Sequence, residues 1–380
     1  MYSTEHLEIG YKIGSHYEIQ KVLGQGGFGI VYLVKDKHQL DKILVVKELF
    51  SKEFSFRNRD SVTVSNKTKA QNIFKKIKEG IIREVNILSK IRNPNVVEAY
   101  GHLEENNTTY SVMEYIEGTD LGKYVEEHGV FDEDEAKNLL RQLIHGLKEI
   151  HNQNIIHRDI KPSNIMRTPE GIYKIIDFST NKKYSDNSIT AITGFTNHVF
   201  TSPELQETKA EVGKFSDIYS IGMTLLRVLS TEERLPNLTD RLTDPSKNDS
   251  SFHYYIDILD ISKEFKKIIK KMTALKAINR YQSLEEIEEV LTIVSKTKEK
   301  KVETSIETEI LFEEEKEDIE GLFKQEPVQQ ETSSLPKKQK SRKRRSKSKS
   351  KEFTIETVIK ILMGVTGFLL IVLLIVFLLK

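Results

Sequence analysis

Hydrophobic and polar residues alternate along residues 17–293 in a way that is typical of one globular region. Apolar, β-branched residues lie on both sides of the glycines in residues 22–34, which predicts a strand, a tight turn and a second strand. Residues 42–50 predict a further strand, and residues 78–91 predict a helix. Residues 131–151 predict a second helix, whose apolar stripe consists of Ala136, Leu139, Leu140, Leu143, Leu147 and Ile150.

The chain changes character after this region. Residues 294–336 begin with a strongly charged, mainly acidic block and then lose all periodicity, which predicts a disordered linker. Residues 361–379 form a run of 19 residues without a charge. A helix of that length extends roughly 28 Å, close to the ~30 Å hydrocarbon core of a bilayer, so we expect a transmembrane helix at 358–379. The alternative, a buried core helix, would need a flanking domain to cover it.

Two interpretations compete for the segment 337–351, which has ten Lys or Arg among fifteen residues. A nuclear-localisation or nucleic-acid tail is the general interpretation of such a run. Its position ten residues before the apolar run favours a membrane function, because positive charge marks the cytoplasmic side and attracts anionic lipid headgroups. We therefore expect a single-pass protein with its globular region in the cytoplasm, and no nucleic acid as partner. The composition favours a prokaryotic plasma membrane; in a eukaryote the same tail would indicate the endoplasmic reticulum or the mitochondrial outer membrane.

Composition adds two limits. The chain has no cysteine, which excludes disulfides and Cys-ligated zinc. The N-terminus has neither the basic nor the apolar region of a secretory signal. The formal net charge of +1 says little about partners, because acidic and basic residues are segregated along the chain.

The glycines of VLGQGGFGIVYLV, residues 22–34, suit a turn that approaches phosphate groups, since a glycine lets backbone N–H groups come close to a ligand. A plain hairpin has a similar pattern. A dinucleotide-binding turn also does, but it requires a helix directly after the glycines, whereas the residues YLV continue a strand.

Two charged residues are predicted to point inward. Lys47 lies in line with Ile43 and Val45 on one face of the strand 42–50. Glu84 shares the apolar face of the helix 78–91. A pair between the two charges would explain both positions and would direct the lysine toward phosphate oxygens.

The densest polar pattern is NIIHRDIKPSNIM, residues 154–166, where Asp159, Lys161 and Asn164 lie in an irregular loop. Pro162 keeps this loop from becoming helical. Thirteen residues beyond Asn164, Asp177 follows a short apolar strand in IIDFST.

With these motifs in order, residues 17–293 resemble the eukaryotic-type (Hanks-type) serine/threonine protein kinases. The resemblance implies an α+β, bilobal kinase fold with a β-rich N-lobe and a helical C-lobe. It implies ATP and Mg²⁺, or Mn²⁺, as cofactors and proteins with Ser or Thr as substrates. It also implies catalytic residues Asp159, Lys161, Lys47 and Glu84, and metal ligands Asn164 and Asp177. The implied nucleotide-binding residues are Leu23, Gly24, Gln25, Gly26, Gly27, Phe28, Gly29, Val31, Val45, Lys47, Met113, Glu114 and Ile116.

The resemblance also implies two structural contacts: Asp217 bracing the catalytic loop, and Arg280 pairing with Glu204. The sequence departs from the family at Ser179, where glycine is usual, and in the segment before Pro203. We expect Ser179 to bias Asp177 toward its metal-holding position. Residues 51–72 lengthen the connection between the Lys47 strand and the Glu84 helix. The leading expectation is an active, membrane-anchored kinase of the non-specific serine/threonine type; the alternatives are a catalytically silent pseudokinase scaffold and a lipid or small-molecule kinase.

Overall fold

The computed structural model describes residues 5–178, 199–206, 210–232, 235–236, 241 and 249–294. All of them belong to the first of two compact units, residues 1–310. Ser179, the linker, the basic segment and the apolar run at 361–379 lie outside the described residues. Within the described ranges, none of the helices combines the length and the hydropathy that a membrane crossing requires.

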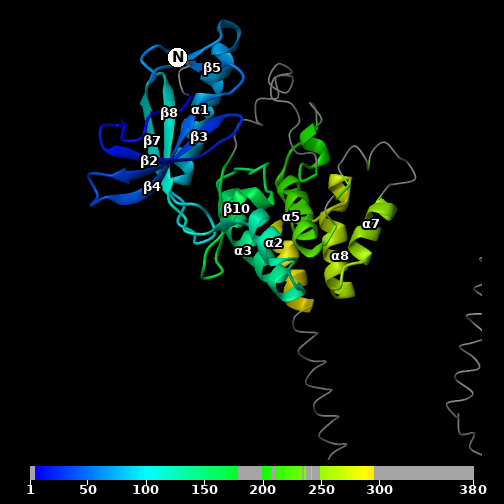
Figure 1. Cartoon of the computed structure of the whole chain (residues 1–380). Coiled ribbons are helices and arrows are strands. Elements are labelled where there is room, and N and C mark those ends of the chain that lie inside the picture. The colour runs from blue at the N-terminus through cyan, green and yellow to red at the C-terminus, as the bar shows by residue number, and fades with distance from the viewer. Residues whose placement is uncertain are drawn as a thin grey trace, which may run out of the picture. The chain divides into compact units, whose positions relative to one another are not determined.

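A six-stranded antiparallel sheet forms the N-lobe (Figure 1). In spatial order its strands are β1 (Lys12–Ile13), β2 (Tyr17–Gln25), β3 (Gly29–Asp36), β4 (Lys42–Leu49), β8 (Thr108–Glu114) and β7 (Ala99–Glu105). The strand, turn and strand predicted for residues 22–34 are confirmed as β2, β3 and the turn between them. The strand predicted for residues 42–50 is confirmed as β4. In β4, Leu44, Val46 and Glu48 form the buried face. Lys47 shares a face with Val45, as the alternation predicts, but this is the opposite, partly open face, so its predicted inward orientation is wrong.

The connection from β4 to the next helix is structured. Residues 51–72 contain a two-stranded hairpin of β5 (Ser55–Arg57) and β6 (Val64–Asn66), and then the 3₁₀ turn η1 (Thr68–Ala70). Helix α1 (Gln71–Leu88) follows and contacts β7 and β8. The predicted helix at 78–91 is therefore correct in its middle and wrong at both ends. Phe74 and Ile77, both buried, extend its apolar face by two turns toward the N-terminus.

The C-lobe is helical with one small sheet (Figure 1). Its helices with described bounds are α2 (Leu121–His128), α3 (Glu133–Asn152), α5 (Lys214–Leu229), α7 (Asp249–Asp257) and α8 (Lys263–Met272), and residues 284–294 are also helical. The small sheet has the order β11 (Tyr173–Ile175), β10 (Ile165–Arg167) and β9 (Thr119–Asp120). Single 3₁₀ turns are η2 (Pro162–Asn164), η4 (Pro203–Gln206) and η6 (Ala277–Asn279).

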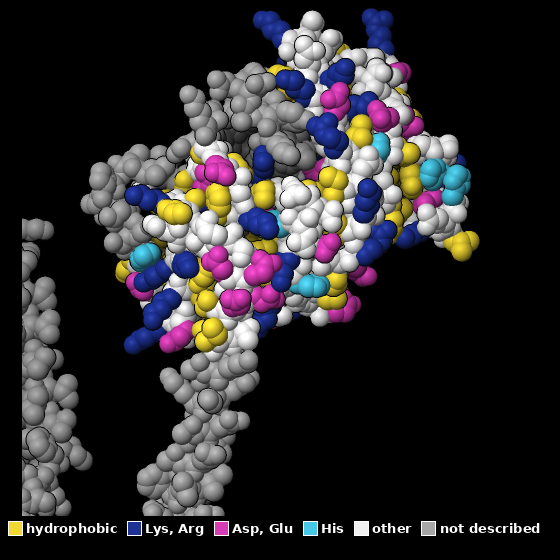
Figure 2. All heavy atoms as spheres, turned by 180° about the vertical axis from the view of Figure 1, so that it is seen from behind, with side chains coloured by type: hydrophobic (Ala, Val, Ile, Leu, Met, Phe, Trp, Pro, Cys, Tyr) yellow, Lys and Arg dark blue, Asp and Glu magenta, His cyan; other side chains and the backbone are white. Residues whose placement is uncertain are grey.

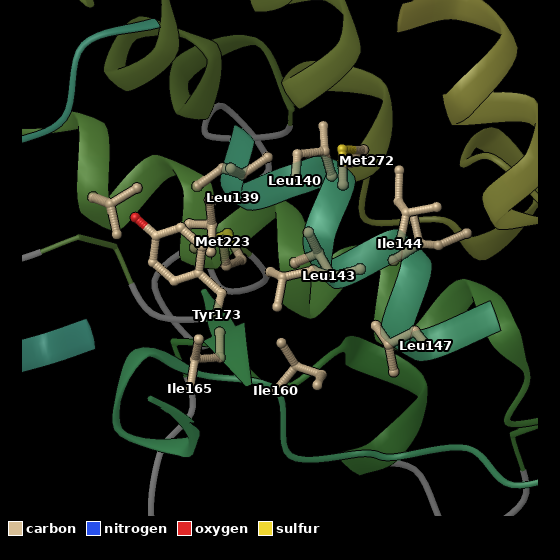
Figure 3. Close-up of a cluster of buried hydrophobic side chains, with 14 of the residues drawn as sticks. Leu139, Leu140, Leu143, Ile144, Leu147, Ile160, Ile165, Tyr173, Met223 and Met272 are labelled. Carbon is tan, nitrogen blue, oxygen red and sulfur yellow. The ribbon is translucent and has the colours of Figure 1, made fainter. Parts of the chain in front are cut away.

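In helix α3, the residues that begin the helix and those that bury one of its faces can be identified in the sequence. Asp132 caps it by accepting a hydrogen bond from the Glu135 N–H at 2.8 Å, and three acidic residues in its first turn suit the positive end of the helix dipole. All six residues of the predicted apolar stripe are buried. All six belong to the core of the C-lobe, where Figure 3 shows the four leucines of the stripe beside Ile160, Tyr173 and Met223. This core positions the loop that follows α3.

Candidate active site

The glycine-rich turn joins β2 to β3 and is closed by a hydrogen bond from the Gly26 N–H to the Gly29 carbonyl at 2.8 Å. A Cβ added to Gly24, Gly26 or Gly27 would meet no atom of the described residues within 4 Å. A Cβ on Gly29 would lie 3.1 Å from Cε of Lys47, so this glycine makes room for the lysine. The turn therefore presents open backbone beside Lys47, as the approach of a phosphate group requires.

Lys47 lies between β3 and β8, where it pairs with Val31 on one side and Ser111 on the other. Its ammonium forms an ion pair with the carboxylate of Asp177. Enclosure of Asp177 would by itself raise the pKa of that carboxyl, but the charge and hydrogen bond of Lys47 hold the pKa below its usual value. Asp177 is therefore ionised at neutral pH.

Glu84 lies on α1 and is only 6% exposed, so its predicted inward orientation is confirmed. The predicted pair with Lys47 is wrong for this structure. Among the described residues, the hydrogen bonds and ion pairs of Lys47 lead to Asp177 and not to Glu84. Glu84 is buried, whereas the side chain of Asp177 is 38% exposed, so an inward orientation alone does not decide which carboxylate the ammonium contacts.

The predicted catalytic loop places two polar side chains around one carboxylate. Oδ2 of Asp159 accepts hydrogen bonds from Nζ of Lys161 at 2.8 Å and from Nδ2 of Asn164 at 2.9 Å. The same amide group donates to the Asp159 carbonyl at 2.8 Å. η2, which begins with Pro162, turns the chain back so that Asn164 reaches Asp159. The loop therefore presents an oriented carboxylate beside an ammonium.

The loop is anchored on Asp217 of α5, which is completely buried. Its carboxylate accepts hydrogen bonds from the N–H groups of His157 and Arg158, at 2.9 and 2.8 Å, and contacts Nε2 of His151 at 2.8 Å. Burial opposes ionisation, but the hydrogen bond and charge of His151 hold the pKa of Asp217 below its usual value. The expected bracing of the catalytic loop by Asp217 is confirmed.

His157 links the catalytic loop to the segment that carries Asp177. Its Nδ1 accepts from the Asp159 N–H at 3.3 Å, so Nε2 carries the proton and donates to the Ile176 carbonyl at 3.2 Å. Burial lowers the pKa of His157, which agrees with this neutral form. The ring of Phe178 lies 4.6 Å from the His157 ring.

Asp177 itself has a left-handed backbone conformation, with φ of 55°. Aspartate is one of the few residues that adopts this conformation at low cost. The Ile176 N–H donates to the Asn164 carbonyl at 2.9 Å, which ties the strand before Asp177 to the end of the catalytic loop. The two predicted metal ligands are thus held by adjoining segments.

The donor groups of Asn164 and Asp177 fit a hard divalent cation. The amide nitrogen of Asn164 is used by Asp159, which leaves the amide oxygen as its donor. Asp177 supplies carboxylate oxygens. Oxygen ligands from carboxylates and amides are those that Mg²⁺ prefers.

Strand pairing brings together several of the residues predicted to contact the nucleotide. Val45 of β4 pairs with Met113 of β8, and Val31 pairs with Lys47. All four side chains are partly exposed on the same sheet. Ile116, also partly buried, lies just beyond β8.

Four other residues that are predicted to contact the nucleotide lie elsewhere in the N-lobe or bind other side chains. The carboxylate of Glu114 accepts two hydrogen bonds from Lys174, at 2.7 and 2.8 Å, and ties β8 to β11. Leu23 is 43% exposed. Gln25 bonds to Glu5 at 2.7 Å and to His6 at 2.9 Å. Phe28, at the tip of the turn, packs against the N-lobe core.

A second predicted contact stabilises the C-lobe. The guanidinium of Arg280 donates to both carboxylate oxygens of Glu204, at 2.7 and 3.0 Å, so the expected pair is confirmed. Ser216 donates to the same carboxylate at 2.7 Å. On the face shown in Figure 2, acidic and basic side chains are interspersed over both lobes, so charge alone selects no partner there.

Sequence reasoning missed His151, Lys174, Glu48 and Arg57. Glu48 and Arg57 form a fully buried ion pair behind β4. The available signal was Glu48 itself, a charged residue on the buried face of a strand, but its partner lies nine residues further on in a segment without a periodic pattern.

Comparison with known proteins agrees with this geometry. Residues 17–292 match the family model described as the protein kinase domain. The chain is 32% identical over 223 residues to serine/threonine-protein kinase PrkC of Bacillus subtilis, an alignment that covers 58% of this chain and 31% of that protein. It is 29% identical over 293 residues to serine/threonine-protein kinase B of Synechocystis, covering 74% of this chain and 47% of that protein. The chain therefore spans about a third to a half of the length of these relatives.

Two solved structures share the fold. The apo form of PpkA-294 gives a TM-score of 0.65 at 26% identity, covering 76% of this chain and 100% of that one. Rad53 1-466 in complex with AMP-PNP gives a TM-score of 0.54 at 24% identity, covering 71% and 63%, and shows the fold alone. The bilobal fold expected from the sequence is thus confirmed. The chain belongs to the protein kinase domain family, and these curated relatives are named serine/threonine-protein kinases.

Proposed function

We propose that this domain transfers the γ-phosphoryl group of ATP to serine and threonine hydroxyls of proteins. The observation that carries the proposal is the arrangement around Asp159, where Lys161 and Asn164 donate to the same carboxylate oxygen. The carboxylate is thereby fixed at the point where an attacking hydroxyl has to be oriented, next to a positive charge.

Each group then has a definable task. Asp159 orients the substrate hydroxyl and accepts its proton as the oxygen attacks the γ-phosphorus and the bond to the ADP oxygen breaks. Lys161 and Lys47 offset negative charge on the phosphate oxygens. Mg²⁺ held by Asn164 and Asp177 would supply further positive charge. Glu84, buried on α1, is proposed to receive the ammonium of Lys47 in the nucleotide-bound state.

The ion pair between Lys47 and Asp177 joins the two groups that the proposal assigns to phosphate oxygens and to the metal. Each group offsets the charge of the other in this partly exposed position. When ATP and Mg²⁺ bind, Asp177 would hold the metal and Lys47 would contact phosphate oxygens, so the pair between them would open. The proposal thus includes a shift of the Lys47 side chain on nucleotide binding.

The test is a phosphoryl-transfer assay with the purified full chain, Mg²⁺, labelled ATP and a generic basic protein. We expect Asp159→Asn to reduce transfer by about 10²-fold or more while ATP binding is retained. Asp260→Asn, the same chemical change at an exposed position, is the matched control and should leave transfer unchanged. Binding of ATP without any transfer by the parent chain would favour the pseudokinase scaffold instead.

We further propose that the chain is anchored to a membrane, with the kinase domain on the cytoplasmic side. The support is the uncharged run 361–379 and the basic segment 337–351 before it. In a flotation assay the full chain should rise with vesicles after alkaline washing, and a chain ending at residue 336 should stay in the soluble fraction. Equal recovery of both chains in the soluble fraction would contradict the anchor.

A further inference from the structure

Residues 50–67, which we name the brace segment, connect β4 to the start of α1 and include the hairpin of β5 and β6. The segment contacts two elements of the proposed nucleotide site. Figure 1 shows β5 at the end of the N-lobe where α1 begins.

The first contact is with the glycine-rich turn. The N–H of Phe50 donates to the Phe28 carbonyl at 3.2 Å, and the N–H of Lys52 donates to the Gly27 carbonyl at 3.2 Å. Gly27 and Phe28 form the tip of the turn, between the strands β2 and β3. The start of the brace segment therefore holds the backbone at the tip from the side of β4.

The second contact runs through Phe54, which is 4% exposed. Its ring lies 6.4 Å from the Phe28 ring and 6.5 Å from the Phe74 ring, in edge-to-face geometry on both sides. Phe74 lies in the first turns of α1 and shares the buried face of that helix with Glu84. One aromatic side chain thus connects the tip of the glycine-rich turn to the helix that carries Glu84.

The brace segment is fixed in place by Arg57. Its guanidinium donates to both carboxylate oxygens of Glu48, at 2.8 and 2.6 Å, and both side chains are fully buried. Tyr32 donates to the same carboxylate at 2.8 Å. Glu48 is the residue after Lys47 and points to the opposite face of β4, so the hairpin is attached directly behind the lysine strand.

We propose that Phe54 is a positioning residue that couples the glycine-rich turn to α1 and so sets the affinity for nucleotide. The inference rests on the proposed function for the role of the turn. Phe54 touches no reacting group. It acts by restricting Phe28 and Phe74, and its loss should leave the turn free to move independently of the helix.

The test compares Phe54→Leu with Phe56→Leu in the full chain. Both changes remove one ring from the brace segment, but Phe56 is 49% exposed. We expect Phe54→Leu to raise the KM for ATP about two- to tenfold, as the loss of aromatic pairs implies, with a smaller effect on kcat. We also expect faster amide hydrogen exchange at residues 24–29 without nucleotide. Phe56→Leu should change neither quantity.

A purely structural role for Phe54 would lower the melting temperature and leave both KM and the exchange at 24–29 unchanged, which would overturn the proposal. Equal effects of the two variants would also overturn it. If the parent chain transfers no phosphate, the proposed function fails, while the exchange measurement still tests the coupling. Phe74→Leu serves as a further check, because combined with Phe54→Leu it should add little to the exchange rate at the turn.

Discussion

Two buried carboxylates, Glu48 in the N-lobe and Asp217 in the C-lobe, attach the two halves of the proposed active site in different ways. Glu48 is held by an opposite charge, the guanidinium of Arg57, with tyrosine hydroxyls beside it. Asp217 accepts hydrogen bonds from two backbone N–H groups of the catalytic loop and contacts His151. A side-chain pair determines where two segments meet, whereas hydrogen bonds from backbone N–H groups determine the backbone conformation. The catalytic loop, where Asp159 has to be oriented, is held by backbone hydrogen bonds.

The largest effect should come from breaking the charge pair. Arg57→Met leaves the Glu48 carboxylate buried without its cation, so we expect the free energy of unfolding to fall by about 3–5 kcal/mol in urea denaturation. Lys270→Met, which removes an ion pair with an exposed aspartate, should cost less than about 1 kcal/mol. Adding Glu48→Gln to Arg57→Met should recover part of the loss. A cost of Arg57→Met below that of Lys270→Met would show that the pair does not hold the brace segment.

The corresponding change in the C-lobe is Asp217→Asn. The amide can accept from one backbone donor but turns its own N–H toward another, so a buried donor loses its partner. We expect a loss of about 2–3 kcal/mol in the free energy of unfolding, together with slower phosphoryl transfer, because the path of the catalytic loop changes. Asp260→Asn is again the exposed control. Loss of stability with unchanged transfer would mean that Asp217 supports the lobe without setting the loop.

The contacts within the catalytic loop and the attachment at Glu48 differ in how far the sequence predicts them. Asp159, Lys161 and Asn164 lie within six residues, and the contacts among them follow from one loop, so the pattern predicts their grouping. Arg57 reaches Glu48 only after the chain has formed a hairpin in a segment without hydrophobic periodicity.

The ion-pair partner of Lys47 is a second contact that the sequence pattern does not predict. That Lys47 shares a face with Val45 follows from strand alternation, and the inward orientation of Glu84 follows from helical spacing. The choice between Glu84 and Asp177 depends on distances between segments that are far apart in the chain. Local patterns therefore predict elements and faces well, and predict pairs across elements only when a resemblance supplies them, as for Arg280 and Glu204.

The catalytic-loop anchor should also respond to pH through His157. Burial lowers the pKa of this histidine in the folded protein from its ordinary value of 6.5. The unfolded chain therefore takes up a proton near pH 6.5 that the folded protein does not bind, so stability is complete above about pH 7 and falls as the pH decreases toward 5. One such proton gives a slope of up to about 1.4 kcal/mol per pH unit. The pKa values of Asp217 and Glu204 are also lowered in the folded protein, so protonation of these two groups reduces the stability further as the pH falls below about 4.5.

Urea denaturation between pH 7.5 and 5 measures this slope. His157→Gln should be less stable at pH 7.5, because it loses buried hydrogen bonds, but its stability should depend less on pH in this interval. His128→Gln, at an exposed position, should keep the slope of the parent. An unchanged slope in His157→Gln would assign the acid sensitivity to other histidines.

The smallest effect should arise where the two lobes are joined by a partly exposed pair. Lys174 of β11 and Glu114 at the end of β8 are 18% and 19% exposed and form two hydrogen bonds. Since water screens such a pair, Lys174→Met should lower the free energy of unfolding by only about 0.5–1 kcal/mol, and 0.5 M salt should reduce the difference. A loss of stability as large as that of Arg57→Met, and independent of salt, would contradict this expectation. The ion pair between the lobes would then stabilise the protein as strongly as the buried pair within the N-lobe.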